Sequence, residues 1–437
     1  MDLDAFTELL TPRGQRALAE AVEVVGADPV VAATRLRRSY DADLTSAALT
    51  QAALRERAKA KFGADAAHMY FTPHGLEQAT RAEVGAHRAR RLAGTAGGTR
   101  VVDVCCGIGG DFLALARAGC VVDAVDLDPL TVAVARANAE ALGLADRVTV
   151  RQADAATVSP EDYDWLFADP ARRTSRGRTF DPMAYSPPWP VVLDLVARAR
   201  RACLKVAPGI PYEFIPGEAE AEWVSYKGEV KEAALWTGPA EGPAQAEGPV
   251  RSEGAARGEG AARGEGAARG EGAARGEGAA RGEGPVRRAT LLPGGETLVA
   301  RGAEAPTGPV GRFVYEPDGA AIRAHLVGEV AEMVGGRLPD PMIAYITGDE
   351  PFDTPWAARY TVEEVLPFSL KRLRATLRER QVGNVVIKKR ASAVDIERLR
   401  NDLRLSGDKS AVIILTRIMD KPSVLICHPS PPAQMAK

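Results

Sequence analysis

The sequence predicts an α/β protein built on a doubly wound, mostly parallel sheet. From residue 100 onward, short apolar runs alternate with segments long enough for a helix, which is typical of parallel strands joined by crossover helices. A glycine-rich turn follows the first apolar run, at the place where open α/β sheets bind ligands. The runs expected to form strands are residues 101–105, 121–125, 148–150, 165–168 and 204–206.

The length of 437 residues exceeds what one hydrophobic core usually organises, so two or three domains are expected. Residues 1–97 carry apolar side chains at helical spacing and are predicted to form a helical N-terminal domain. Residues 98–308 are predicted to form the domain built on the parallel sheet. Residues 309–437 mix strand-like runs with helical segments and are predicted to form a compact α+β domain.

Residues 241–288 consist of eight consecutive six-residue units, five of which are the identical Glu-Gly-Ala-Ala-Arg-Gly. Two glycines in each identical unit oppose a helix, and no large apolar side chain is available for burial, so we expect a disordered segment. The flanking residues 229–236 and 288–292 have the composition of strands. This indicates that the repeat extends the tip of an antiparallel hairpin at the sheet edge; the alternative is a plain linker between domains.

Composition and charge limit the possible partners. The 56 basic and 58 acidic side chains nearly balance, so any surface that binds nucleic acid must be local. The N-terminal residues carry acid where a secretory signal carries base, and no apolar run reaches the roughly 18 residues of a membrane span. The five cysteines lack the spacing of a disulfide framework or a zinc site. We therefore expect a cytoplasmic protein without a metal.

The turn after the first predicted strand has the composition of a nucleotide-binding turn. Gly107 and Gly109 allow the backbone to approach a ligand closely, and the helix that begins beside them presents free N–H groups. Taken alone, this pattern also suits NAD or FAD, or a turn with a purely structural role.

Carboxylates follow the next two predicted strands. Asp126 lies 19 positions beyond Gly107 at the end of the second strand, where it can accept hydrogen bonds from both ribose hydroxyls. Asp128 is the alternative, but the Leu-Asp-Pro sequence around it is typical of a helix N-cap. Asp154 follows the third strand, where it could hold an adenine amino group; the alternative is a capping role in the loop.

The fourth predicted strand is followed by Asp169 and Pro170, beside the crevice where ligands of open α/β sheets bind. Proline stiffens the turn, so the carboxylate can point in one fixed direction. A methyltransferase that acts on an exocyclic amine needs such an acceptor, because it must hold the nitrogen in line with the methyl group. A dehydrogenase has no particular need of it.

Five motifs in this order resemble class I S-adenosylmethionine-dependent methyltransferases, and the likeness is greatest to trimethylguanosine synthase and other guanine-N2 RNA methyltransferases. They begin with Asp-x-Cys-Cys-Gly-x-Gly-Gly and occupy residues 103–110, 125–129, 135–139, 152–155 and 169–170. Nearly the whole chain except the repeat is also similar to actinobacterial-type methyltransferases with a C-terminal THUMP-like domain. The segments that carry this second likeness are residues 76–80, 222–225 and 315–320.

The resemblance implies a Rossmann-like sheet, S-adenosylmethionine as the cofactor, a THUMP-like fold for residues 309–437 and a role for individual residues. It assigns the methionine end of the cofactor to Asp103, Cys105, Gly107 and Gly109, the ribose to Asp126, the adenine to Asp154, and the target amine to Asp169 and Pro170. Cys105 stands where many of these enzymes have the first glycine of the turn.

The residues after Asp-Pro depart from the guanine-N2 pattern. Those enzymes usually continue with Pro and an aromatic residue that stacks on the flipped base, whereas this chain has Ala171, Arg172 and Arg173. Phe71 or Trp189 could stack on the base instead, and the alternative for both is a place in the core. Arg172 and Arg173 suit contacts with phosphate, or else belong to a solvated loop.

Basic residues also gather in the C-terminal domain. Arg372 lies on a predicted helix with several other cations, and Lys388 closes the next predicted strand. This surface fits the RNA-binding role that the THUMP resemblance implies, and the alternative is a helix that simply faces water. We therefore expect an RNA-modifying N-methyltransferase, with guanine N2 favoured. The alternatives are a methyltransferase of the same fold acting on DNA, protein or a small molecule, and a non-catalytic RNA-binding protein that retains a cofactor pocket.

Overall fold

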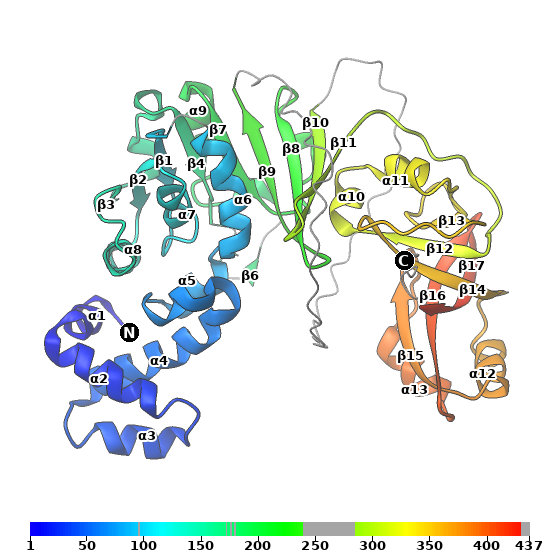
Figure 1. The fold of residues 1–437 in the computed structure, drawn as a ribbon, viewed down its shortest axis with the longest axis horizontal. Coiled ribbons are helices and arrows are strands. Elements are labelled where there is room, and N and C mark those ends of the chain that lie inside the picture. The colour runs from blue at the N-terminus through cyan, green and yellow to red at the C-terminus, as the bar shows by residue number, and fades with distance from the viewer. Residues whose placement is uncertain (95–96, 172, 175–176, 179–180, 239–284, 430–437) are drawn as a thin grey trace, which may run out of the picture.

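Figure 1 shows a group of helices at the N-terminus, a large central sheet and a smaller C-terminal sheet. The computed structural model describes all residues except 95–96, 172, 175–176, 179–180, 239–284 and 430–437. Residues 241–284 of the segment expected to be disordered therefore lie outside the described residues, whereas residues 286–288 at its end belong to a strand, which corrects the expectation there. Within the described part of the chain, no helix is both long and apolar enough to cross a bilayer.

The N-terminal region is helical, and most of its helices begin at an Asp or Thr whose side chain accepts a hydrogen bond from the first turn. The last of these helices, α6, leaves the group and runs along the central sheet (Figure 1). The helices are α1 (Leu3–Leu10), α2 (Pro12–Glu23), α3 (Pro29–Leu36), α4 (Ala42–Phe62), α5 (Pro73–Gln78) and α6 (Ala82–Ala93).

The central sheet has nine strands in the order β11-β10-β8-β9-β7-β4-β1-β2-β3. The five strands expected from the apolar runs are present and parallel to their neighbours among them. The chain moves outward in one direction from β1 and in the other from β4, so the carboxyl ends of β1 and β4 flank the crevice. These five strands are β1 (Arg100–Val104), β2 (Val121–Asp126), β3 (Val148–Gln152), β4 (Trp165–Ala168) and β7 (Ala202–Val206).

The prediction that the strands on either side of the repeat pair as a hairpin is wrong. β9 (Glu229–Thr237) and β10 (Val286–Leu292) are both strands, but β8 (Glu220–Tyr226) lies between them, antiparallel to β9 and parallel to β10. Residues 221–226 of β8 are all buried, so its backbone N–H and C=O groups need partners on both sides. The edge of the sheet is formed instead by β11 (Glu296–Val299), which pairs with β10.

Helices cover the parallel strands, and a short two-stranded hairpin leaves the sheet after β4. The hairpin pairs residues 173–174 (β5) with residues 177–178 (β6). The helices are α7 (Phe112–Arg117), α8 (Pro129–Ala141) and α9 (Trp189–Arg198).

The second sheet has six strands in the order β13-β12-β14-β17-β16-β15. Two helices, α12 (Leu370–Glu379) and α13 (Ile396–Leu403), contribute Leu373, Leu377, Leu399 and Leu403 to the core on one of its faces. The strands are β12 (Phe313–Pro317), β13 (Ile346–Gly348), β14 (Ala357–Pro367), β15 (Val382–Lys389), β16 (Lys409–Ile418) and β17 (Lys421–Pro429).

The two sheets are joined by a continuous core rather than by a bare linker. Helices α10 (Gly319–Arg323) and α11 (Val327–Met333) follow β12, and α10 contacts β8, β9 and β10 of the central sheet. Buried residues of β12 and of both helices belong to the same apolar cluster as β1, β4 and β7. The chain between residues 313 and 346 thus supports both sheets.

Candidate active site

The turn after β1 adopts the backbone conformation that a close ligand contact requires. Cys105, Gly107 and Gly109 have φ angles of 62°, 58° and 105°, in the left-handed region that favours glycine. A Cβ at Gly109 would also lie 2.6 Å from the ring of Phe112. Cys105 is the non-glycine residue in this run, and its backbone is therefore strained.

We expect Cys105→Gly to stabilise the fold by about 0.5–1 kcal/mol. Glycine removes the clash of Cβ in the left-handed region, which costs about 1–2 kcal/mol, but adds freedom to the unfolded chain. Thermal unfolding of the two proteins without cofactor tests this. An unchanged or lower Tm would show that the thiol makes contacts that outweigh the backbone strain.

Asp103 carries a fully buried carboxyl group on β1. Its side chain is inaccessible to solvent on β1, and neither oxygen has a hydrogen-bond partner among the described residues. Burial raises the pKa of Asp103 well above its usual range, and the nearby Asp111 and Asp169 raise it further. An unpaired buried carboxylate beside a glycine turn fits a cationic ligand group such as the ammonium of a methionine moiety.

Asp126 is the last residue of β2, and Asp154 follows the neighbouring parallel strand β3 at the same rim of the sheet. Asp126 accepts hydrogen bonds from the backbone N–H groups of Gly107 (3.0 Å) and Asp128 (3.1 Å), so it is tied to the turn after β1. Burial raises the pKa of Asp126. Asp154 is exposed and caps a short 3-10 turn through the N–H of Ala156 (2.9 Å), which matches the capping alternative but leaves acceptor capacity for a ligand.

Asp169 lies just after β4, next to the turn of β1. Its backbone N–H donates to the carbonyl of Val104 at 3.4 Å, which holds the two strand ends together. Its side chain, 24% exposed, forms an ion pair with Lys205 on β7. Pro170 is buried. The structure therefore brings Asp169 and Pro170 close to Asp103 and the glycine turn.

A buried charge network extends beneath this site, and sequence reasoning missed it. Arg88 of α6 forms ion pairs with Asp111, at the start of α7, and with Glu232 of β9. Lys205 connects the same network to Asp169. The pKa of Asp111 is lowered, because Arg88 and Lys205 outweigh the effect of burial. One sequence signal could have revealed part of this network: Lys205 is a charged residue inside the apolar run that forms β7, and all residues of that strand are buried.

Two residues considered for base stacking belong to the core. Phe71 is fully buried against Phe62, with ring centroids 5.7 Å apart. Trp189 is 4% exposed and packs edge to face with Tyr185 and Phe214. The core alternative is therefore correct for both, because each ring packs against other aromatic side chains and is excluded from solvent.

The predicted basic residues have different surroundings. Arg172 and the side chain of Arg173 lie outside the described residues. Arg372 is exposed on α12. Lys388 is half-buried and forms an ion pair with Glu316 at 2.7 Å, so its charge is neutralised within the second sheet rather than presented to a ligand.

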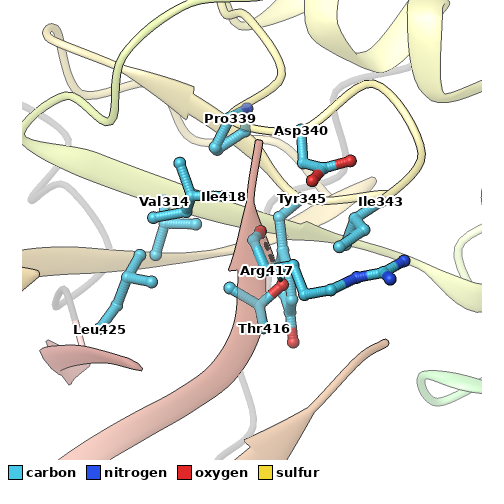
Figure 2. Close-up of a pocket in the computed structure, with 9 residues that line it drawn as sticks. All are labelled: Val314, Pro339, Asp340, Ile343, Tyr345, Thr416, Arg417, Ile418 and Leu425. Carbon is cyan, nitrogen blue, oxygen red and sulfur yellow. Dashed lines mark hydrogen bonds between the residues drawn. The ribbon is translucent and has the colours of Figure 1, made fainter. Parts of the chain in front are cut away.

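A small cavity in the second sheet is lined by other residues than those assigned to the cofactor and the target amine. Figure 2 shows it between β12, β16, β17 and the loop that carries Asp340 and Tyr345. Its lining includes none of the residues assigned to the cofactor. Among the described residues, no cluster of His, Cys, Asp and Glu has the arrangement of a metal site.

Family models match three parts of the chain. A model described as RNA cap guanine-N2 methyltransferase matches residues 98–192, and one described as THUMP domain-like matches residues 357–429. A domain of unknown function matches residues 2–58.

Relatives match the chain over most of its length. A protein of Mycobacterium tuberculosis (strain CDC 1551 / Oshkosh), named as an S-adenosylmethionine-dependent methyltransferase, is 34% identical over 396 residues, which is 86% of this chain and 95% of the relative. The protein of strain H37Rv matches to the same extent. A solved structure of a candidate methyltransferase from Porphyromonas gingivalis W83 has a TM-score of 0.69 at 20% identity and covers 94% of this chain and 98% of its own. The predicted Rossmann-like fold and THUMP-like region are confirmed.

Proposed function

We propose that this chain, which belongs to the family of S-adenosylmethionine-dependent methyltransferases, transfers the methyl group to a nitrogen of an RNA base, with guanine N2 favoured. The observation that carries the proposal is the position of Asp169. Its carboxylate follows β4 beside the cofactor turn, within the region that resembles RNA cap guanine-N2 methyltransferases. The THUMP-like region supports an RNA substrate.

The bound cofactor supplies an electrophilic methyl group on its sulfonium, so the residues of the chain have to bind, orient and accept hydrogen bonds. Asp103 would pair with the ammonium of the cofactor, Asp126 would accept from the ribose hydroxyls, and Asp154 would accept from the adenine amino group. Asp169 would accept a hydrogen bond from the target amine and hold its nitrogen in line with the methyl group.

Transfer of tritium from labelled S-adenosylmethionine to total RNA, followed by identification of the methylated nucleoside, tests the proposal. We expect label in RNA, mainly as an N2-methylated guanosine. Label in another base would correct the modified atom. Label that appears only in DNA, protein or small molecules would contradict an RNA substrate.

One observation supports a second candidate function, in which the methyl acceptor is a small molecule or a protein side chain. The two aromatic residues that could replace the missing stacking residue after Asp169-Pro170, Phe71 and Trp189, are both buried in the core. A small molecule or a protein side chain would not need such a ring. Counting the label separately in each fraction of a cell extract distinguishes these substrates from RNA.

The exposed cations of α12 allow a separate test of RNA binding. Lys371, Arg372 and Arg378 are exposed on this helix. Binding of single-stranded RNA weakens as the salt concentration rises. For each of these cations that pairs with a phosphate, its removal should reduce the slope of log Kobs against log[salt] by about 0.7. A triple substitution by alanine should therefore weaken RNA binding without changing cofactor binding. This is preferable to removing residues 310–437, because α10 and α11 belong to the core of the central sheet.

Asp103→Asn is expected to weaken cofactor binding while stabilising the cofactor-free protein. The change removes a charge-assisted interaction of about 1.5–3 kcal/mol with the ammonium, which corresponds to a Kd roughly 10–100-fold higher. It also removes a buried carboxylate that has no partner among the described residues. Calorimetry with S-adenosylmethionine and thermal unfolding measure the two effects.

The stabilisation by Asp103→Asn should depend on pH. The folded-state pKa of Asp103 is raised above the unfolded value of about 3.9, so the folded protein holds this proton more tightly and loses stability as pH rises above that value. The advantage of the variant should therefore be larger at neutral pH than in acid. A variant that unfolds at a lower temperature at neutral pH would contradict this account of Asp103.

A further inference from the structure

Lys205 is a charged residue in the middle of a buried strand. All five residues of β7 are buried, and the side chain of Lys205 is only 4% exposed. Burying an ammonium costs several kcal/mol, and an apolar side chain of similar length would fill the same space without that cost. Lys205 therefore needs an explanation beyond packing.

The partners of Lys205 come from three separate segments of the chain. Its Nζ forms an ion pair with Asp169 after β4, donates to the Oγ1 of Thr80 at 2.8 Å and lies 4.0 Å from Asp111 at the start of α7. The hydroxyl of Thr80 in turn donates to Asp111 at 2.6 Å. Of the three N–H donors of the ammonium, one donates to Asp169 and one to Thr80, and Asp111 adds a nearby negative charge.

The contacts restrict the direction of the acceptor carboxylate. Lys205 contacts Oδ2 of Asp169, so Oδ1 stays available for another donor. Asp169 is also close enough to Asp103 for a negative charge on one to disfavour a negative charge on the other. The ammonium of Lys205 offsets this repulsion at the one carboxylate that must face the substrate.

We propose that Lys205 is a positioning residue of the methyltransferase: it fixes Asp169 through Oδ2 and directs Oδ1 toward the target amine, with Thr80 holding the ammonium in place. The inference concerns the same site as the proposed function and rests on Asp169 being its acceptor, but it does not depend on the acceptor being RNA.

The test combines Lys205→Met with Asp169→Asn in a double-mutant cycle. Label transfer is measured in RNA, DNA, protein and small-molecule fractions of an extract, so activity on any acceptor reports on Lys205. We expect Lys205→Met to lower kcat by about 10–100-fold, as misplaced reacting groups do, with the Kd of S-adenosylmethionine changed less than about threefold. On the Asp169→Asn background the same change should cost less than about threefold, because coupled residues are not additive.

Three further variants separate positioning from folding. Lys205→Arg should have a kcat at least about tenfold higher than that of Lys205→Met, since it restores a buried cation next to Asp169. Thr80→Val keeps Lys205 and should lower kcat by about 3–10-fold, which provides a test if Lys205→Met does not fold. Lys231→Met, on the neighbouring strand, changes a lysine whose partner is the exposed Glu229 and should leave kcat unaltered.

Two outcomes would overturn the inference. One is a kcat for Lys205→Met or Thr80→Val equal to that of the natural chain. The other is an equal loss from Lys205→Met with and without Asp169, which would show that the lysine acts independently of the acceptor. Label found only outside RNA would contradict the proposed substrate while leaving the cycle fully interpretable.

Discussion

Asp169→Asn is expected to lower the rate of methyl transfer by about 10²–10³-fold, the usual loss when one preorganised hydrogen-bonding group is removed from an active site. The asparagine side chain has a single acceptor oxygen, and Lys205 would draw that oxygen toward itself. The amide NH2 would then face the target amine, so two donors would oppose each other. The loss should appear in kcat rather than in the Kd of S-adenosylmethionine.

Single-turnover label transfer and cofactor calorimetry on the same preparations measure the two quantities. Asp164→Asn is the matched control. This carboxylate directly precedes β4, at the opposite end of the strand from Asp169, and accepts a hydrogen bond from the N–H of Arg100 at 2.9 Å. We expect the control to transfer methyl groups at the natural rate. Full activity in Asp169→Asn would exclude the carboxylate as the acceptor.

Arg88→Ala is expected to lower the free energy of unfolding by about 3–5 kcal/mol, because removing one partner of a buried ion pair leaves the other charges uncompensated. Arg88 is 2% exposed and pairs with Asp111 and Glu232, whose side chains are also nearly inaccessible. It also lies over the ring of Phe167, 4.8 Å from its centroid. In the variant, Glu232 would lose the cation that pairs with it, and Asp111 would keep only one cation, Lys205 at 4.0 Å, among the described residues.

Urea unfolding of the cofactor-free protein provides the measurement. Arg91→Ala on the same helix is the control: Arg91 binds Glu220 through two hydrogen bonds of 2.6 and 3.0 Å but is 37% exposed. Ion pairs of this exposure contribute about 0–1 kcal/mol, so the control should lose much less stability. Similar losses from the two variants would mean that burial of the Arg88 network does not govern the stability of α6 against the sheet.

The parallel half of the sheet could be predicted because its strands have a local signature. Each is a short apolar run, and a carboxylate or a glycine turn follows most of them. Since the carboxyl ends of parallel strands share one rim, the convergence of Asp103, Asp126 and Asp169 near the turn follows from strand order alone. The family likeness then supplied the cofactor.

The other half of the sheet has no such signature. The composition of β9 and β10 identifies both as strands, but their partner is set by β8, which is inserted between them. Pairing across a connection of this length depends on long-range packing that no window of sequence contains. The same limit applies to the buried charges. Arg88 looks like an ordinary solvent-facing cation of a helix, and Lys205 stands out only as a charge within an apolar run, while the partners of both are set by the fold.

The shared core between the two sheets limits how they can move. α10 contacts the central sheet, and Ser225 of β8 donates a hydrogen bond to Asp318 at 3.1 Å, immediately before that helix. Because this junction is packed rather than hinged, we expect the second sheet, which carries α12, to keep its position relative to the central sheet, which carries Asp169. A polymer that contacts both the α12 cations and Asp169 would then have to span the distance between them. Its folded shape, and not only its local sequence, would therefore decide whether it is a substrate.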